Sequence, residues 1–299
     1  MTAPPAREAR GLPVSVATAL IVFSVCCFGS ISIIATVATR EGASLLGLLT
    51  WRYVGALATL GIIAGHVIAA RQNRARAWPI VSLGGGIQAL IAYLTLASLE
   101  YITAATLGFL FYTYPAWVAA IAAIRRTEPL TPTRLGALAL SLIGIAVMVG
   151  SPWADPVPLP GLVLALSAAI LYAIYIPLID HLQRGVHPVA ATAYIAVGAA
   201  IAFLVAGAAT GSLAALVLPT PTAWAMAALL ATVCTTIAFV TFLTALPILG
   251  SVRTAIISTV EPFYTAIAGA AVLGQPITTE TIIGGAMIAA AVVLLQRRG

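Results

Sequence analysis

Apolar residues along the chain form ten long blocks, which short breaks rich in proline, glycine and charge separate. The blocks run for about 17 to 25 residues, and an α-helix needs about 20 residues to cross the roughly 30 Å of hydrocarbon in a bilayer. The pattern therefore predicts an all-α integral membrane protein with ten transmembrane helices. We place them at residues 14–37, 45–69, 78–99, 103–124, 133–149, 159–178, 189–209, 222–246, 252–273 and 281–296.

Composition agrees with a membrane environment. Hydrophobic residues make up 62% of the 299 residues and charged residues 7%, and the mean hydropathy is +1.10. A water-soluble core cannot hide this much apolar surface, so the lipid bilayer is an expected partner. The first block is longer than the apolar region of a signal peptide, about 7 to 15 residues, and we interpret it as a retained helix.

The basic residues predict the direction of the helices, because cytoplasmic loops of membrane proteins carry an excess of positive charge. All 14 are arginines. Arg40 lies on one side and Arg52 within the second helix, while the other twelve share the opposite side, so we expect both termini in the cytoplasm. Arginines spread over helix ends do not form the clustered patch that nucleic acids need. The twelve are Arg7, Arg10, Arg71, Arg74, Arg76, Arg125, Arg126, Arg134, Arg184, Arg253, Arg297 and Arg298.

The three cysteines, Cys26, Cys27 and Cys234, lie inside apolar blocks and lack the spacing of a metal site or a disulfide framework. Buried free cysteine behaves as a small hydrophobic residue. We therefore expect no metal and no cofactor.

The chain contains a weak internal repeat. An offset of 147 residues places Leu96 on Leu243, Pro115 on Pro262 and Pro129-x-Thr131 on Pro276-x-Thr278. This register predicts two halves, residues 1–150 and 151–299, with five helices each. Since five is odd, the second half enters the membrane from the opposite side, so we expect two inverted repeats around a central cavity.

Pro115 and Pro262 fall near the middle of the fourth helix of each half. Proline removes a backbone donor and kinks a helix, and the freed carbonyl needs a neighbour or a wet cavity. Matching kinks at mid-depth favour a central cavity, although prolines in membrane helices can also mean bending alone.

These features carry a resemblance to a known family. Two halves of five helices, each with a fourth-helix proline and the turns Thr127-Glu128-Pro129-Leu130-Thr131 and Gly274-Gln275-Pro276-Ile277-Thr278, resemble the EamA family of the drug/metabolite transporter superfamily. Within it, the sequence is similar to YddG-type amino-acid exporters of bacterial inner membranes. The resemblance implies alternating access and export of amino acids or related metabolites, and we expect a monomer. Gln275 departs from the acidic Glu128, and the first helix lacks the acid that four-helix multidrug relatives use for proton exchange.

Two charged residues at membrane depth are candidates for the transport site, because burying a charge there costs about 2.5 to 3.5 kcal/mol. Glu261 shares a helix face with Thr254, Ser258 and Thr265, so it could bind an amino group or take up a proton. The alternative is a paired or protonated acid in the packed bundle. Arg52 could hold a carboxylate, or its side chain could extend to the outer interface.

Uncharged residues complete the candidate set. Gln88 offers an amide inside an apolar helix, where it could line the cavity or join helices. Aromatic and hydroxyl side chains near mid-depth could contact an amphipathic substrate, although packing and hydrogen bonding within one helix explain each of them as well. This group contains Trp51, Tyr93, Tyr112, Tyr172, Tyr175, Thr236, Phe239 and Ser258.

The function class follows from what the helices carry. The sequence contains no zinc motif, acidic pair or serine–histidine couple at membrane depth, so an intramembrane enzyme is disfavoured. A channel would need a carbonyl filter or a ring of acids, and neither is recognisable. We expect a secondary transporter that exports amino acids, among them aromatic or other apolar ones, or related small metabolites. The alternative is a multidrug or metabolite exporter with proton antiport through Glu261.

Overall fold

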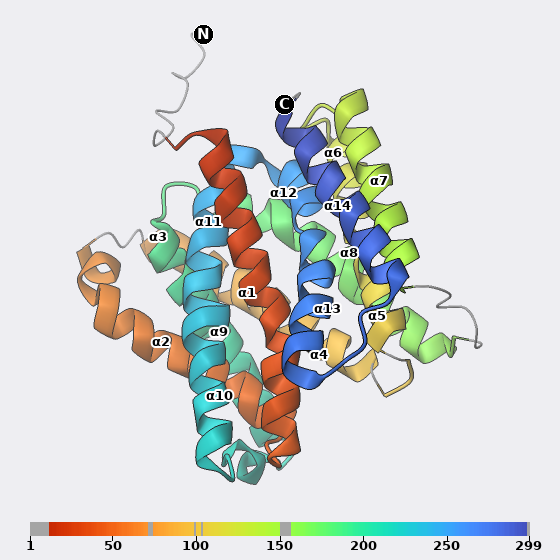
Figure 1. Ribbon diagram of the computed structural model, residues 1–299. Helices are drawn as coiled ribbons and strands as arrows, with labels where there is room; N and C mark the ends of the chain where they lie inside the picture. The colour runs from red at the N-terminus through yellow and green to blue at the C-terminus, as the bar shows by residue number, and fades with distance from the viewer. Residues whose placement is uncertain (1–11, 71–73, 99, 103, 150–156, 298–299) are drawn as a thin grey trace, which may run out of the picture.

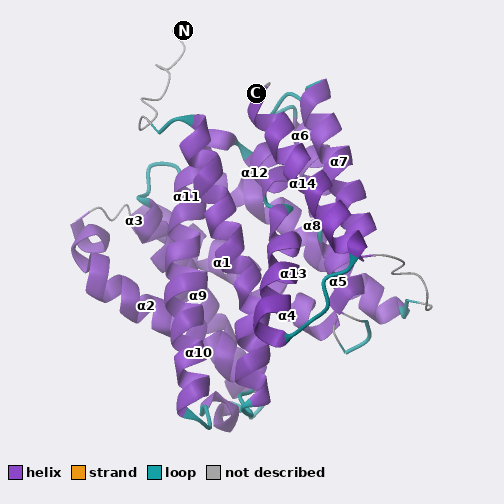
Figure 2. Cartoon of the chain, viewed as in Figure 1, coloured by secondary structure: helices purple, strands orange, loops and turns teal. Residues whose placement is uncertain are grey.

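The structure, a computed structural model, describes residues 12–70, 74–98, 100–102, 104–149 and 157–297. These residues form helices and connections without a single strand (Figures 1 and 2). Ten helical segments are long and apolar enough to cross a membrane, which confirms the predicted all-α fold with ten spans. Arg7, Arg10, Arg71 and Arg298 lie outside the described residues.

The first half contains α1 to α7. The second half contains α8 to α14, and a short 3-10 turn, η2, lies in it at Leu213–Leu216. The first five spans are α1 (Val14–Arg40), α2 (Leu45–Ala70), α3 with η1 and α4 (Arg74–Pro79, Ile80–Gly85, Gly86–Ser98), α5 with α6 (Ala104–Phe111, Tyr114–Arg125) and α7 (Pro132–Val149). The second five are α8 (Leu159–Leu182), α9 (Pro188–Ala209), α10 with η3 and α11 (Pro221–Ala231, Thr232–Ile237, Ala238–Leu249), α12 with α13 (Ser251–Ile257, Val260–Leu273) and α14 (Thr279–Arg297).

The fourth span of each half is two helices rather than one kinked helix. The first break falls at residues 112–113, and Pro115 lies in the first turn of α6. The second falls at residues 258–259, and Pro262 follows at the start of α13. A proline in a first turn loses no hydrogen bond, because the N–H there has no partner within the helix. The backbone N–H groups at residues 112–113 and 258–259 bond to carbonyls three or four residues earlier, so each break is a turn between two short helices.

The third span of each half contains a π-helical segment, η1 in the first half and η3 in the second. In η3, Thr235 Oγ1 and Thr236 Oγ1 donate to carbonyls five residues earlier, at 2.8 Å and 3.0 Å. A π-turn widens the helix and redirects carbonyls from the regular ladder. The carbonyl of Cys234 is one of these, and Arg52 donates to it.

Helix packing between the halves follows the repeat. The first span, α1, packs against α11 and α13 of the second half, and the sixth span, α8, packs against α4 and α6 of the first. The second spans α2 and α9 pack on each other, as do the fifth spans α7 and α14. Gly144 and Gly284 let the backbones of α7 and α14 approach closely. Each half thus uses the same helices to contact the other.

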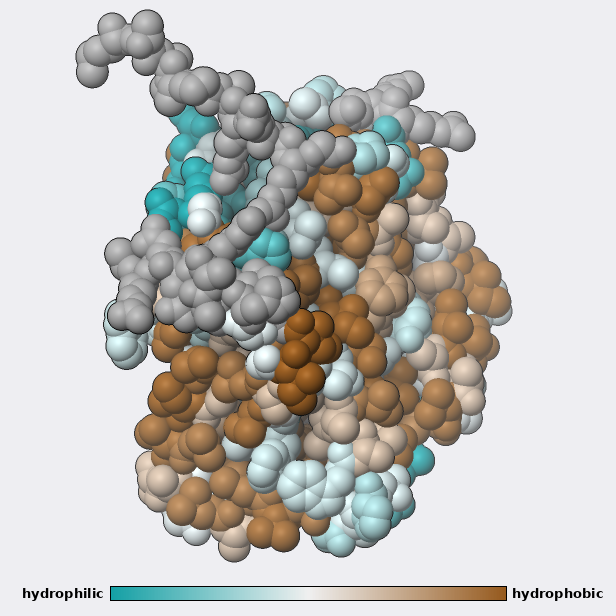
Figure 3. All heavy atoms as spheres, turned by 90° about the vertical axis from the view of Figure 1, so that its left-hand side faces the viewer, coloured by the Kyte–Doolittle hydropathy of each residue, from teal (hydrophilic) through white to brown (hydrophobic). Residues whose placement is uncertain are grey.

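The outer surface is apolar over most of its height. Figure 3 shows hydrophobic side chains across the middle of the face in view, with hydrophilic ones toward its upper and lower ends. Ile62 is 86% exposed and Ile124 82%. Exposure of large aliphatic side chains on this scale fits contact with lipid rather than water.

Candidate functional site

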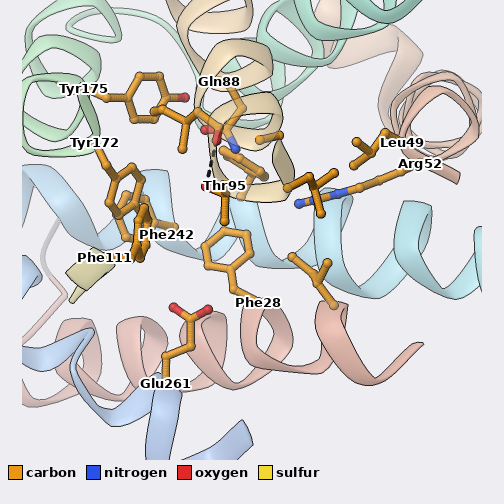
Figure 4. A pocket seen from close by; sticks show the side chains of 15 residues that line it. Phe28, Leu49, Arg52, Gln88, Thr95, Phe111, Tyr172, Tyr175, Phe242 and Glu261 are labelled. Carbon is orange, nitrogen blue, oxygen red and sulfur yellow. Dashed lines mark hydrogen bonds between the residues drawn. The ribbon is translucent and has the colours of Figure 1, made fainter. Parts of the chain in front are cut away.

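A central cavity of about 200 Å³ lies between the two halves. Arg52, Gln88 and Glu261 supply charged and amide groups, and Thr95 adds a hydroxyl; the rest of the wall is aromatic or aliphatic. In Figure 4, Arg52, Gln88 and Glu261 point toward the space between them from three helices. The full lining is Phe28, Ile31, Leu49, Arg52, Gln88, Ile91, Ala92, Thr95, Leu96, Phe111, Tyr172, Tyr175, Phe239, Phe242 and Glu261.

Arg52 is held inside the bundle. Its side chain is 5% exposed and therefore does not extend to the outer interface. Nε donates to Thr235 Oγ1 at 2.7 Å and Nη2 donates to the carbonyl of Cys234 at 3.3 Å. A guanidinium has five N–H donors, so these two bonds to described residues leave donors for a ligand in the cavity. The guanidinium also lies 5.1 Å from the centre of the Tyr53 ring.

Glu261 comes from the first turn of α13, immediately after the break in the ninth span. Tyr112, which lies at the matching break of the first half, is close enough to this carboxylate to interact with it. Among the described residues Glu261 forms no salt bridge, and the two pairs that exist are Arg134–Glu128 and Arg184–Asp180. The cavity thus contains one cation and one acid that do not pair with each other.

Aromatic rings cover two sides of the cavity. Phe28 of α1 meets Phe239 and Phe242 of α11 edge to face, with ring centres 5.1 Å and 6.1 Å apart. On the other side Tyr172 stacks on Phe111 at 5.5 Å and on Tyr175 at 6.1 Å. Rings in these arrangements form a rigid apolar surface against which another flat or branched group can pack.

Two polar atoms at the cavity have no partner among the described residues: Gln88 Oε1 and the Tyr175 hydroxyl. Buried polar groups are nearly always hydrogen-bonded, because an unsatisfied one costs about 1–3 kcal/mol. Water or a bound molecule must satisfy them. Gln88 Oε1 accepts only, so its partner needs an N–H or O–H donor.

The structure brings six of the sequence candidates together around this cavity: Arg52, Gln88, Tyr172, Tyr175, Phe239 and Glu261. It places Trp51 and Tyr93 elsewhere. Trp51 Nε1 donates to the carbonyl of Leu216 at 2.7 Å, and its ring packs on Trp224. Tyr93 is 61% exposed and belongs to a second cavity.

Three further candidates lie behind the cavity wall. Tyr112 contacts Glu261 but does not line the cavity. Thr236 and Ser258 are buried, and each hydroxyl donates to a carbonyl of its own helical segment, that of Ala231 or Thr254. Both hydroxyls therefore stabilise local backbone at the π-segment and the helix break.

Sequence reasoning missed Phe28, Phe111 and Phe242, which line the cavity. Phe242 follows Phe239 by three residues and so lies on the same helix face, a signal that was available. Phe28 lies four residues after Ser24 and four before Ser32, on one helix face, so a signal was available there too. Among the described residues no group of three or more histidine, cysteine, aspartate or glutamate side chains could hold a metal ion.

A second cavity, of about 750 Å³, adjoins the first. Leu49 and Leu96 line both. The second cavity extends between α2, α4, α8 and α9 to Glu100, Tyr101 and Thr210, at the end of the molecule away from the chain termini (Figure 1). We call it the vestibule.

Toward the chain termini the bundle is closed. Buried side chains of α6, α11 and α12 belong to one core cluster there, including Val118, Ala122, Leu249, Val252 and Ala255. A site reached from one face and closed by packing at the other is the arrangement by which a membrane transporter exposes its cavity to one side at a time.

Comparison of the sequence with known protein families shows to which family of transporters the chain belongs. The chain belongs to the EamA-like transporter family, whose sequence model matches residues 16–150 and again residues 159–297. Each match covers five spans, and the family consists of transporters rather than enzymes. A small-molecule substrate and a lipid environment follow from this membership.

The fold has a counterpart among solved structures. A protein titled only "Crystal structure of protein" superimposes with a TM-score of 0.78 at 19% sequence identity, over 94% of this chain and 96% of that one. This likeness concerns the fold alone. No protein with a curated description matches the sequence.

Proposed function

We propose that this protein exports amino acids or closely related small zwitterions across a bacterial inner membrane by alternating access of the central cavity. The two halves, residues 1–150 and 151–299, act as the inverted repeats that move against each other. One chain supplies the whole cavity, so the proposed working unit is a monomer.

The observation that carries this proposal is the unpaired charge of Arg52 and Glu261 in one aromatic cavity. A carboxylate can accept from the free N–H groups of Arg52. An ammonium group can donate to Glu261 and to Gln88 Oε1, the acceptor without a partner. A molecule that carries both groups neutralises the acid and the cation at once, while its side chain packs on the rings.

Cavity size favours a small substrate over a drug. Pockets for drug-sized ligands measure about 300–1,000 Å³, whereas the central cavity measures about 200 Å³. A single amino acid is the kind of molecule that this space accommodates. The aromatic wall favours apolar and aromatic side chains within that class.

The arginine distribution supports cytoplasmic termini. With that direction, the vestibule faces the outside, and the described conformation is open outward. Helix breaks and prolines at Pro115 and Pro262 supply the places where the fourth spans can bend when the cavity opens to the other side.

Counterflow in proteoliposomes tests the proposal. Vesicles loaded with an unlabelled amino acid should take up the same labelled amino acid transiently above equilibrium, and the rate should saturate. Uptake of zwitterionic amino acids, but not of the matching amines or carboxylic acids, is expected. Ohmic ion current without counterflow would contradict a carrier. Transport of hydrophobic cations that is driven by a pH gradient would favour the alternative of proton-coupled drug export through Glu261.

A further inference from the structure

The contact between the halves at the closed face centres on Glu128. Glu128 lies in the connection from α6 to α7 of the first half, and its Oε1 accepts from the backbone N–H of Ser251 at 2.7 Å and of Val252 at 3.3 Å. Both N–H groups belong to the start of α12 in the second half. Glu128 Oε2 accepts from Arg134 Nη1 at 3.2 Å, which orients the carboxylate.

The start of α12 depends on this carboxylate. The residue before the helix is Gly250, which has no side chain to satisfy the first N–H groups and adopts a φ of 79°. A Cβ added to Gly250 would lie 2.8 Å from Glu128 Oε2. Glycine at this position therefore leaves room for the Glu128 carboxylate. The carboxylate accepts from the first N–H groups of α12, which is the role that an N-cap side chain of the helix itself usually has.

The described residues of the opposite face show no equivalent contact. The repeat offset of 147 residues matches Glu128 with Gln275. Gln275 is exposed in the connection after α13, and its side chain lies against Gly269 of that helix. Among the described residues no hydrogen bond links the Gln275 side chain to the first half. A contact that is present at the closed face and has no counterpart among the described residues of the open face stabilises one of the two conformations over the other.

We propose that Glu128 is a positioning residue of the transport cycle, which holds the bundle closed at the face where the chain termini lie. Its contact with Ser251 and Val252 breaks each time the cavity opens to that face. This inference rests on the proposed alternating access. Opening that face has to separate α6 from α12, which pack on each other, so the contact cannot persist through the cycle. Its loss shifts the population toward the conformation open at that face.

Side-specific cysteine labelling of the full chain in membranes tests this. Two reporters are placed in a background with C26A, C27A and C234A: Ala122→Cys, 4% exposed at the closed face, and Ala97→Cys, in the vestibule. A membrane-impermeant maleimide is applied from each side. E128A should raise labelling at position 122 by about fivefold, the size expected for loss of a helix-capping acceptor, and lower labelling at position 97.

Three further variants sharpen the result. E128Q keeps an acceptor but loses the ion pair with Arg134, so its effect should be intermediate. Gly250→Ala leaves Glu128 in place but obstructs its carboxylate, and it should act in the same direction as E128A. Q275A is the matched control at the other face and should not raise labelling at position 122.

Unchanged labelling at position 122 in E128A overturns the proposal. A rise at both reporters does so too, because general loosening of the bundle exposes both, whereas a shift between two conformations moves them in opposite directions. The measurement needs no substrate. If labelling shifts as expected while no amino acid is transported, the role of Glu128 stands and the proposed substrate class fails.

Discussion

Arg52 Nε donates to Thr235 Oγ1 at 2.7 Å, and this bond joins α2 of the first half to the π-helical segment of the second. Thr235 Oγ1 itself donates to the carbonyl of Leu230, which fixes the direction of its lone pairs. The guanidinium is therefore oriented before any ligand arrives, with its remaining donors available to the central cavity. Orientation in advance lowers the entropy cost of binding.

Arg52→Gln should weaken amino-acid binding by about 10- to 100-fold, since a hydrogen bond to a charged group contributes roughly 1.5–3 kcal/mol. Binding to purified protein, measured by calorimetry or by half-saturation in counterflow, checks this. Arg40→Gln is the matched control, because Arg40 is exposed at the end of α1. Equal affinity in Arg52→Gln and the unmodified protein would exclude a carboxylate site at Arg52.

Thr235→Val should have a smaller effect in the same direction. The substitution keeps a similar volume but removes the acceptor that orients Arg52. We expect a weaker affinity with the charge still present, and a separate loss of about 1–3 kcal/mol in stability for the two broken bonds, to Arg52 and to the carbonyl of Leu230. Affinity and thermal unfolding measured on the same preparation separate the two effects. An affinity unchanged by the substitution would show that Arg52 finds its position without Thr235.

Glu261→Gln should weaken binding of the substrate amino group while leaving transport independent of an imposed pH gradient. Glutamine retains an acceptor but no charge, so the attraction to an ammonium group falls. Exchange rates at several pH values, with and without a gradient, provide the measurement, and Glu280→Gln at the exposed start of α14 is the control. Loss of gradient-driven flux in Glu261→Gln alone would instead assign proton coupling to this carboxyl. Unchanged affinity and pH profile would remove Glu261 from both roles.

Gly144→Leu should destabilise the protein by about 1–3 kcal/mol, the usual cost of overpacking. An added Cβ at Gly144 would lie 2.8 Å from the carbonyl oxygen of Gly284 and 3.0 Å from Ile288, so α7 and α14 would have to separate. The melting temperature in detergent measures the effect. Gly61→Ala is the control, because nothing lies within 4 Å of a Cβ there. It should leave the melting temperature equal or higher, since alanine favours a helix over glycine.

Hydropathy and the arginine pattern were enough to predict the spans, because the hydrocarbon thickness fixes how long an apolar block must be. The central charges could also be singled out from the sequence. A charged side chain at membrane depth, such as Arg52 or Glu261, is costly and therefore rare in an apolar helix. Local chemistry, rather than long-range contacts, carries both signals.

Other features depend on contacts that sequence spacing does not reveal. Pro115 predicts a bend in one helix, whereas the structure has a complete break at residues 112–113 and Pro115 in the first turn of the next helix. Trp51 was predicted to line the cavity, but its indole N–H donates to the carbonyl of Leu216, 165 positions away. In the sequence, Glu128 stands out only as an acid where the second repeat has Gln275. Its partners are the backbone N–H groups of Ser251 and Val252. Backbone partners leave no mark in a sequence pattern.

The junction between the central cavity and the vestibule gives the last prediction. Leu49 of α2 and Leu96 of α4 line both spaces, so a substrate that leaves the central cavity toward the open face has to pass them. Leu96→Trp should slow exchange by about tenfold or more, because a barrier higher by roughly 1.4 kcal/mol is sufficient for that. Binding at equilibrium should change less, since Arg52, Gln88 and Glu261 are untouched. Leu90→Trp is the matched control, because Leu90 lines the vestibule only and is 47% exposed. Rates of counterflow and equilibrium affinity, measured for both variants, decide the matter. Equal slowing by the two substitutions would mean that the vestibule as a whole, and not the Leu49–Leu96 junction, limits exit.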